Sequence, residues 1–241
     1  MIQEFSALDG ALLIDKPSGP TSHDVVDVIR RHFKVKKVGH CGSLDPNATG
    51  LLLIVLGRGT KLSEMLMSDD KVYGGTVKFG ETTSSYDSDG ELVASLPVPP
   101  LTLEHLNEAA AEFVGDQMQT PPMVSAVKKD GVPLYKLARK GMEVEREARL
   151  IHVYRFRFSS YLEPLGQFEL ACTKGTYVRS IAHELGQKLG CGAHLSSLRR
   201  LRSGKFDVAD ATQLEDVMKL TEKELERRVI PFLTLARGAP A

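Results

Sequence analysis

Residues 40–50 read His-Cys-Gly-Ser-Leu-Asp-Pro-Asn-Ala-Thr-Gly, and this stretch carries the strongest structural signal in the chain. Its acid, Asp45, lies between two glycines and directly before Pro46, which predicts irregular backbone rather than a helix or a strand. The uninterrupted apolar run from Leu51 to Leu56 that follows has the length of a buried strand. The stretch therefore predicts a loop that presents one carboxylate beside a core strand.

Basic side chains surround this acid along the sequence. From residue 30 to residue 61 the chain has seven lysines and arginines and a single acid, Asp45. Nearby positive charge favours an ionised carboxylate, and a field of this sign attracts a polyanion such as RNA or DNA. An ordinary polar turn beside a solvated basic face is the alternative, and only other parts of the chain can decide between the two.

The composition is that of an ordinary globular protein. The chain has 241 residues, 42% of them hydrophobic, which is enough for one large domain or two smaller ones. We expect a cytoplasmic protein, because the N-terminus lacks the features of a secretory signal and no apolar run approaches a membrane span. The net charge is zero, but residues 194–206 hold four basic and no acidic side chains, whereas residues 81–91 hold four acidic and no basic ones. This uneven distribution fits a nucleic-acid-binding surface.

The three cysteines, Cys41, Cys172 and Cys191, form no close pair and no zinc-ligand spacing. We expect them to be buried packing residues, and their odd number fits a reducing compartment. A nucleophilic Cys41 activated by the adjacent His40 is the weaker alternative, since neighbours in sequence need not be partners in space. The sequence has no phosphate-binding glycine motif and no paired carboxylates of fixed spacing, which argues against nucleotide-binding and two-acid hydrolytic sites.

Apolar periodicity predicts strands and helices in irregular alternation, which favours an α+β fold with a mixed sheet over a regular βαβ array. The predicted strands cover 10–15, 51–56, 72–80, 151–158 and 168–170, and the predicted helices cover 22–33, 60–67, 102–114 and 176–189. We expect a single domain over residues 1–241. Its last part, 207–241, is interpreted as an acidic helical extension that is too short to be another domain.

Residues 119–147 differ from their surroundings. Two prolines at 121 and 122 open the segment, Asp130-Gly131 marks a turn, and five basic side chains crowd around Tyr135, namely Lys128, Lys129, Lys136, Arg139 and Lys140. The pattern predicts an insertion that projects and grips RNA, and a plain surface hairpin followed by a helix is the alternative.

Five segments together resemble the TruB family of tRNA pseudouridine synthases, in order and spacing from residue 10 to about residue 206. They are the run from Gly10 to Gly19 with its Lys16-Pro17 pair, the loop His40–Gly50, Asp70-Lys71-Val72-Tyr73, the stretch from Pro121 to Lys128 with Leu134-Tyr135, and the stretch from Cys172 to Arg179. The resemblance implies the pseudouridine synthase fold, a largely antiparallel central sheet flanked by helices. It also implies isomerisation of uridine 55 in the T arm of tRNA, without a cofactor and without a metal.

The resemblance further implies the catalytic residues. Asp45 corresponds to the family's nucleophile, Tyr73 to the tyrosine that stacks on the flipped uracil, and Arg179 to the arginine that pairs with the aspartate. Each assignment also makes chemical sense, because a carboxylate can attack the sugar or the ring, an arginine can orient it, and a phenol can manage the proton at C5. Whether Asp45 attacks the base or the ribose stays open.

Six further residues are candidates for substrate binding. His40 resembles the family's histidine that fills the space left by the flipped base, and Leu198 resembles the apolar residue that closes the uracil pocket. Lys16 is interpreted as a brace under the loop that could also touch phosphate. Lys128, Arg199 and Arg200 are expected to contact tRNA. Judged alone, His40 would be a surface residue and Leu198 a core residue.

The chain departs from the family pattern in two places. Cys41 and Asn47 replace a threonine and a leucine beside the aspartate, which should tune rather than abolish activity. Many members of the resembled family carry a C-terminal RNA-binding domain of the PUA type, whereas this sequence ends at Ala241. We therefore expect no full PUA domain, and we expect the grip on tRNA to fall on residues 119–147 and on the arginines at 199–202. We expect a monomer with tRNA as its partner, no obligatory protein partner and no membrane. The alternatives are a non-catalytic tRNA-binding protein and a synthase for another RNA, including one in a guide-RNA particle.

Overall fold

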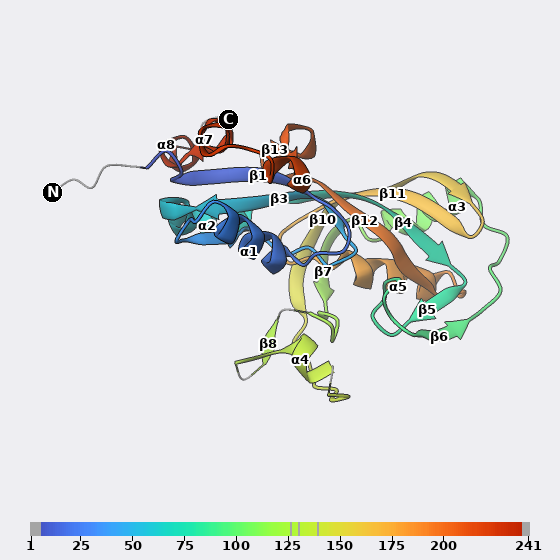
Figure 1. Cartoon of the computed structure of the whole chain (residues 1–241). Coiled ribbons are helices and arrows are strands. Elements are labelled where there is room, and N and C mark those ends of the chain that lie inside the picture. Colours follow the sequence, from blue (N-terminus) through green and yellow to red (C-terminus); the bar gives the residue numbers. More distant parts are fainter. Residues whose placement is uncertain (1–5, 126, 130, 139, 238–241) are drawn as a thin grey trace. The chain divides into compact units, whose positions relative to one another are not determined.

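The structure is a computed structural model that describes residues 6–125, 127–129, 131–138 and 140–237 (Figure 1). It comprises two compact units, of which unit 1 is Met1–Tyr73 with Arg199–Ala241 and unit 2 is Gly74–Leu198. The divisions fall inside strand β4 (Lys71–Phe79) and strand β12 (Ala193–Ser203), so both strands contribute residues to both units.

The core of unit 1 is a mixed sheet built on the strand pair β1 (Gly10–Lys16) and β3 (Thr49–Leu56). The pair is antiparallel, with Gly10 opposite Leu56 and Lys16 opposite Gly50. Every residue of β1 is buried, as are all residues of β3 after Thr49, which explains their near-continuous apolar sequence. Four short strands and the Arg199–Ser203 end of β12 complete the sheet: β2 (Val38–His40), β13 (Phe206–Asp207), β14 (Thr212–Gln213) and β15 (Ile230–Pro231).

Helix α1 (Ser22–His32) starts where the sequence predicts it. The Thr21 side chain accepts a hydrogen bond from the backbone N–H of Asp24, and the Asp24 side chain accepts from the backbone N–H of Thr21, which is a complete capping box. The apolar face of the helix is buried in unit 1. The other helical segments of this unit are η1 (Gly57–Leu62), α2 (Ser63–Ser68), η2 (Val208–Asp210), α6 (Leu214–Val217), α7 (Glu222–Arg228) and α8 (Phe232–Ala236).

Unit 2 is built on the long antiparallel strands β10 (Arg149–Leu162) and β11 (Leu165–Cys172). Strand β7 (Gly115–Gln119) pairs with β10, and the sheet order is β12-β4-β11-β10-β7. Buried phenylalanines from three strands pack against one another on this sheet, including Phe79, Phe158 and Phe168. Helices α3 (Leu103–Ala111) and α5 (Val178–Lys188) belong to the same unit, and α3 packs on β10.

Two small hairpins complete unit 2. Strands β5 (Glu81–Thr83) and β6 (Leu92–Ser95) pair with each other, and β8 (Lys128–Lys129) pairs with β9 (Val132–Pro133) ahead of helix α4 (Leu134–Ala138). The segment 119–147 is therefore a hairpin and a helix, whose use in RNA binding stays a prediction. Asp130 and Arg139, both named in the sequence patterns, lie outside the described residues.

The observed architecture confirms the predicted α+β fold with a mixed, largely antiparallel sheet flanked by helices. One expectation needs correction, because the stretch after Asp207 is not wholly helical. Residues of β14 and β15 pair with β1, Thr212 with Ile14 and Ile230 with Ala11. The C-terminal segment thus completes the sheet of unit 1 as well as adding helices to it.

Candidate active site

The segment 41–48, which joins β2 to β3, is the Asp45 loop. It has no helix or strand, as its glycines and proline predict. The Cys41 N–H donates to the Leu53 carbonyl at 2.9 Å, and the Ala48 N–H donates to the Asp45 carbonyl at 3.1 Å. The Asp45 side chain is half-buried. The loop therefore holds a carboxylate at the protein surface on an irregular but hydrogen-bonded backbone.

Lys16 is the brace of the Asp45 loop. Its side chain is fully buried, and its Nζ donates to the carbonyls of Pro17 (2.9 Å), Pro46 (2.9 Å) and Ala48 (2.7 Å). These contacts use all three donors of the ammonium group. The structure thus favours the bracing role expected for Lys16 over a contact with phosphate.

Burial lowers the pKa of Lys16 to about 8; the charge of Asp45 opposes this shift and that of Arg200 adds to it. Between pH 8 and the ordinary lysine pKa of 10.5, the unfolded chain therefore binds more protons than the folded chain. The contribution of Lys16 to the free energy of unfolding should rise with pH in this window, by up to about 1.4 kcal/mol per pH unit. Urea denaturation of the wild type and of Lys16→Met at pH 8, 9 and 10 measures this contribution. It is the difference between the two proteins in the slope of the free energy of unfolding against pH.

Lys61→Met is the control for that experiment, because it removes an exposed lysine from the same unit. Parallel pH profiles for the wild type and Lys16→Met would contradict the expected linkage.

The start of helix α1 fixes the other side of the loop. The Ser22 hydroxyl accepts a hydrogen bond from the Leu44 N–H at 2.8 Å and donates to the Leu44 carbonyl at 3.2 Å. The Gly19 N–H donates to the Pro46 carbonyl at 2.9 Å. The backbone on both sides of Asp45 is thus tied to the residues around the helix start, which limits how far the carboxylate can move.

The structure gives Arg200 a different role from the one that the sequence predicts. Its side chain is 1% exposed, its Nε donates to the Leu51 carbonyl at 2.7 Å, and one Nη donates to the Gly42 carbonyl at 3.1 Å. The sequence suggests an arginine on the surface that binds phosphate. An enclosed guanidinium is not accessible to phosphate in this structure, which favours a second brace under the Asp45 loop.

Arg199 is differently placed. Its guanidinium forms a bidentate pair with Asp15, at 2.9 and 2.7 Å, and Gln213 also donates to Asp15 at 2.7 Å. Asp15 is buried, whereas 41% of the Arg199 side chain is exposed. These contacts tie β1 to β12 and β14 and leave part of the Arg199 side chain exposed. Contact with RNA therefore remains a prediction for Arg199, but not for the enclosed Arg200.

His40, directly before the loop, and Cys41, its first residue, are uncharged at neutral pH. Burial, with the charges of Arg200 and His23, lowers the pKa of His40, which is half-buried. Burial raises the pKa of the Cys41 thiol to about 11, so it is not a thiolate near neutrality. The expectation that Cys41 is a packing residue agrees with this environment. Cys172 and Cys191 are also buried.

Tyr73 lies in β4 and is half-buried. Lys71, two residues earlier, is 5% exposed, and its Nζ donates to the carbonyls of Met67 and Asp69. Burial lowers the pKa of Lys71, and the charge of Arg200 adds to this effect. The segment that carries Tyr73 therefore starts at a buried cation, just as the Asp45 loop is braced by two.

Arg179 occupies a buried position in unit 2, in the first turn of α5, and is 4% exposed. Its guanidinium donates to the carbonyls of Ser85 (3.1 Å) and Val124 (2.8 Å) and lies 3.3 Å from the Asp87 carboxylate. The Asp89 N–H donates to Asp87 at 3.0 Å. The predicted pair of Arg179 with Asp45, a residue of unit 1, stays a prediction.

Asp87→Asn tests this cluster. Removing one partner of a buried ion pair leaves a buried charge with less compensation, so the free energy of unfolding should fall by roughly 3 kcal/mol. Glu112→Gln is the matched control, since Glu112 pairs with Lys188 at 2.6 Å and both side chains are exposed. That change should cost less than about 1 kcal/mol. Chemical denaturation measures both, and equal effects would argue against a stabilising Arg179–Asp87 pair.

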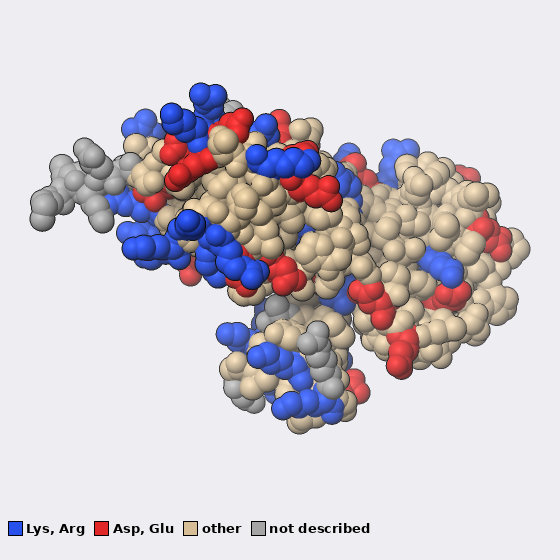
Figure 2. All heavy atoms as spheres, in the orientation of Figure 1, with Lys and Arg blue, Asp and Glu red and all other residues tan. Residues whose placement is uncertain are grey.

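The remaining candidates are on the surface or partly so. Leu198 is half-buried in β12, and Lys128 is exposed in β8. Figure 2 shows Lys and Arg side chains gathered over the segment with β8 and α4, where the exposed ones include Lys129, Lys136 and Lys140. A second exposed basic group follows helix α1 in unit 1 and includes Lys34, Lys36 and Lys37. Both are surfaces that a polyanion can approach.

In unit 1 the structure brings Lys16 and Arg200 together at the Asp45 loop. The sequence predicted a bracing role for Lys16 but not for Arg200. The partners missing from the sequence interpretation are Ser22, Asp15 and Asp87, whose roles depend on contacts far apart along the chain. Within the described residues, no group of three or more His, Cys, Asp and Glu side chains is arranged to hold a metal ion. Nor does that part of the chain contain a helix long and apolar enough to cross a membrane.

Comparison with known proteins adds independent evidence. Residues 30–178 match the family model described as TruB family pseudouridylate synthase (N terminal domain), and residues 179–235 match the tRNA pseudouridylate synthase B C-terminal domain. The chain is 54% identical over 236 residues to the tRNA pseudouridine synthase B of Opitutus terrae, covering 98% of each chain. It is 44% identical to that of Syntrophotalea carbinolica, covering 97% of this chain and 76% of the relative.

A solved structure has a similar fold. A chain in a Cbf5-Nop10-Gar1 complex matches with a TM-score of 0.74 and 28% identity, over 93% of this chain and 60% of that chain. This chain therefore spans about 60% of the length of that structural relative. With two family models that together cover most of its length and relatives of one name that match nearly all of it, the chain belongs to the TruB family of tRNA pseudouridine synthases, which isomerise uridine to pseudouridine in tRNA.

Proposed function

We propose that this chain converts uridine 55 in the T loop of tRNA to pseudouridine, with Asp45 as the nucleophile. The observation that best supports this role is the bracing of the Asp45 loop. Buried Lys16, Ser22 and Arg200 hold the backbone on both sides of Asp45, while its own side chain is only half-buried. A fixed backbone that presents a partly accessible carboxylate suits a group that must attack a bound substrate.

The reaction breaks the bond from C1′ of the ribose to N1 of uracil and forms a bond from C1′ to C5. N1 gains a proton and C5 loses one, so no oxidant, reductant or second substrate is needed. Asp45 supplies the nucleophile for the first step. Tyr73 supplies a ring that can stack on uracil and a hydroxyl that can take part in the transfer of the C5 proton. Arg179 supplies the positive charge that favours an ionised carboxylate.

A uridine inside a folded T loop must leave its stack before it can react. We assign His40 to the space that the base vacates, because it lies at the end of β2, directly before the Asp45 loop, and is half-buried. As a neutral imidazole it can stack and hydrogen-bond without carrying a buried charge. Leu198 is assigned to the apolar wall of the uracil pocket.

We assign the phosphates of the T arm to the exposed lysines of the 119–147 segment, including Lys128, and to the exposed part of Arg199.

We propose that the enzyme acts in the cytoplasm as a monomer, without an obligatory protein partner. Sedimentation of the protein with and without tRNA measures its oligomeric state and the stoichiometry of the complex. A monomer that forms a 1:1 complex with tRNA is the expected result.

Incubation of the purified protein with an unmodified tRNA transcript, followed by mapping of pseudouridine, tests the proposed function. The expected result is pseudouridine at position 55 and none in a transcript with cytidine there. Binding without any product would favour a non-catalytic tRNA-binding protein. Product at another position, or only in another RNA, would assign the enzyme a different substrate.

A further inference from the structure

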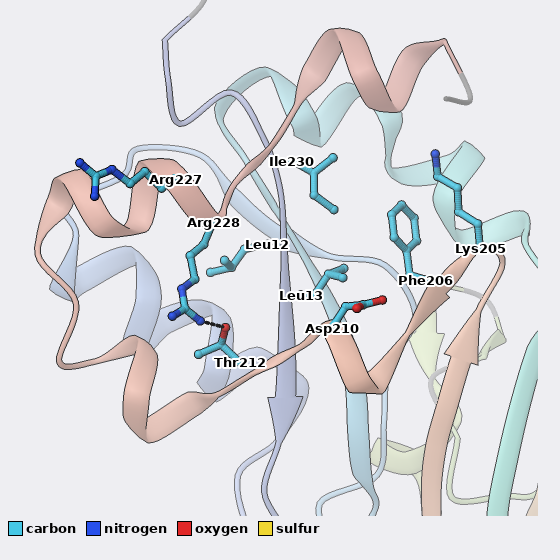
Figure 3. A pocket seen from close by; sticks show the side chains of 9 residues that line it. All are labelled: Leu12, Leu13, Lys205, Phe206, Asp210, Thr212, Arg227, Arg228 and Ile230. Atoms are coloured by element: carbon cyan, nitrogen blue, oxygen red, sulfur yellow. Dashed lines mark hydrogen bonds between the residues drawn. The ribbon is translucent and has the colours of Figure 1, made fainter. Parts of the chain in front are cut away.

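Unit 1 has a cavity that shares no lining residue with the Asp45 loop. Its volume is about 530 Å³, which lies in the range of small-ligand sites. It is formed by the middle of β1 together with residues of the C-terminal segment (Figure 3), and its lining side chains are Leu12, Leu13, Lys205, Phe206, Asp210, Thr212, Arg227, Arg228 and Ile230. None of the roles assigned above uses this cavity.

The cavity combines an apolar floor with a basic rim. Leu12 and Phe206 are 1% and 2% exposed, so they form the floor rather than a contact surface. Lys205 and Arg228 are exposed, and Figure 3 shows them on opposite sides of the apolar side chains. Of the three cations in the lining, Arg227 is directed away from the other side chains, so Lys205 and Arg228 face a single acid, Asp210. The rim therefore has a net positive charge and suits an anion.

Both rim cations are held in place. The Arg228 Nη1 donates to the Thr212 hydroxyl at 2.6 Å, which uses one of the five N–H donors of a guanidinium (Figure 3). The Lys205 Nζ lies 5.4 Å from the centre of the Phe206 ring, within the range of a cation–π contact. Side chains that are already ordered lose less entropy when they bind a ligand. The two cations are thus better prepared to bind than lysines and arginines that extend freely into solvent.

The chemistry of the lining selects phosphate rather than a base. Stacking of a nucleobase needs an exposed aromatic face, and Phe206, the aromatic residue of this lining, is buried. Phosphate oxygens accept hydrogen bonds from guanidinium and ammonium groups, which the rim provides from two sides. An RNA backbone also brings many such groups to the protein at once.

We propose that this cavity binds a backbone phosphate of tRNA at a place other than the T-loop uridine. The proposal rests on the proposed function, since it takes the substrate of the enzyme as the source of the phosphate. Arg228 contacts this phosphate and is oriented by the Thr212 hydroxyl, and Lys205, on the other side of the apolar side chains, contacts another phosphate of the same backbone. The cavity extends the tRNA-binding surface to the segment after β12.

Arg228→Gln and Lys205→Gln test the proposal, with Arg227→Gln as the matched control. Arg227 neighbours Arg228 in the same helix, but Figure 3 shows its guanidinium directed away from the other lining side chains. The dissociation constant of tRNA is measured against salt concentration for all variants. Loss of one phosphate contact should weaken binding several-fold and reduce the slope of log K against log salt by about 1. Arg227→Gln should change both quantities less.

Thr212→Val separates binding from structure. If Arg228 only ties α7 to β14, Thr212→Val and Arg228→Gln should lower the free energy of unfolding alike and leave the salt slope unchanged. This result would overturn the proposal, as would equal slopes for Arg228→Gln, Lys205→Gln and Arg227→Gln. Competition by uridine monophosphate at the cavity, with an unchanged tRNA slope, would assign it to a free nucleotide and also overturn it. Absence of pseudouridine with the wild type would instead refute the proposed function.

Discussion

Asp45→Asn is expected to abolish pseudouridine formation while leaving the fold and tRNA binding intact. An asparagine side chain has nearly the shape of aspartate, but its amide is a far weaker nucleophile and carries no charge. Loss of a nucleophile typically costs roughly four to six orders of magnitude in rate. The measurement is a single-turnover assay of pseudouridine in a tRNA transcript, with the dissociation constant of the same transcript determined in parallel.

Asp216→Asn is the control, because it makes the same chemical change at a carboxylate with 59% of its side chain exposed in the same unit. It should retain the wild-type rate. The assignment of Asp45 would fail if Asp45→Asn retained more than about one hundredth of the wild-type rate, since general acid–base groups alone typically contribute 10²–10⁴-fold. A variant that lost tRNA binding as well would point to a structural role for the carboxylate.

Local signals in the sequence identified the elements on which the site is built. The capping residues of α1, the apolar run of β3 and the glycines and proline of the Asp45 loop each act over a few residues, so their structural consequences follow from the sequence alone. The position of Asp45 in a loop could be predicted for the same reason, because its signal is also local. The single acid of this loop is conspicuous among basic neighbours along the chain.

The braces of the site could not be predicted in this way. Arg200 follows Gly42 by 158 residues and Arg179 follows Ser85 by 94, so their hydrogen bonds depend on the tertiary fold. A basic run such as the one that includes Arg199, Arg200 and Arg202 is typical of an exposed surface. The strand β12 buries the second of these and leaves the others partly or fully exposed. Alternation separates Arg199 from Arg200, but Arg202 shares a face with Arg200, so their different burial depends on what each packs against. Sequence therefore revealed the charges but not which of them are accessible.

The same limit applies to short strands. Strands β14 and β15 have two residues each, too few for any periodic pattern, and they form because β1 offers hydrogen-bonding partners on its free side. The residue pattern of the C-terminal segment predicted helices, and the segment has α6 and α7 between these strands and α8 after them. The cavity with Lys205 and Arg228 exists only because both kinds of element pack on β1.

Gly50→Ala is expected to destabilise the protein and to reduce activity, through the contact of β12 with the start of β3, directly after the Asp45 loop. Gly50 has φ +97°, and a Cβ at this position would lie 2.3 Å from the Arg200 carbonyl oxygen and 2.8 Å from the Arg200 nitrogen. These are backbone atoms of a paired strand, so they cannot turn aside as a flexible side chain would. The cost combines backbone strain of about 1–3 kcal/mol with overpacking of about 1–3 kcal/mol.

Gly19→Ala separates the two contributions. Gly19 has φ +110° and also contacts the Asp45 loop through its backbone, but a Cβ there would meet nothing within 4 Å. This variant should lose only the free energy due to backbone strain, and it should remain closer to the wild type in both urea denaturation and pseudouridine formation. If Gly50→Ala proved no less stable than Gly19→Ala, close packing of β12 against the start of β3 would not be what fixes the loop. A larger loss of stability in Gly50→Ala, together with slower product formation, would show that the backbone of Arg200 helps to position Asp45 as its side chain does.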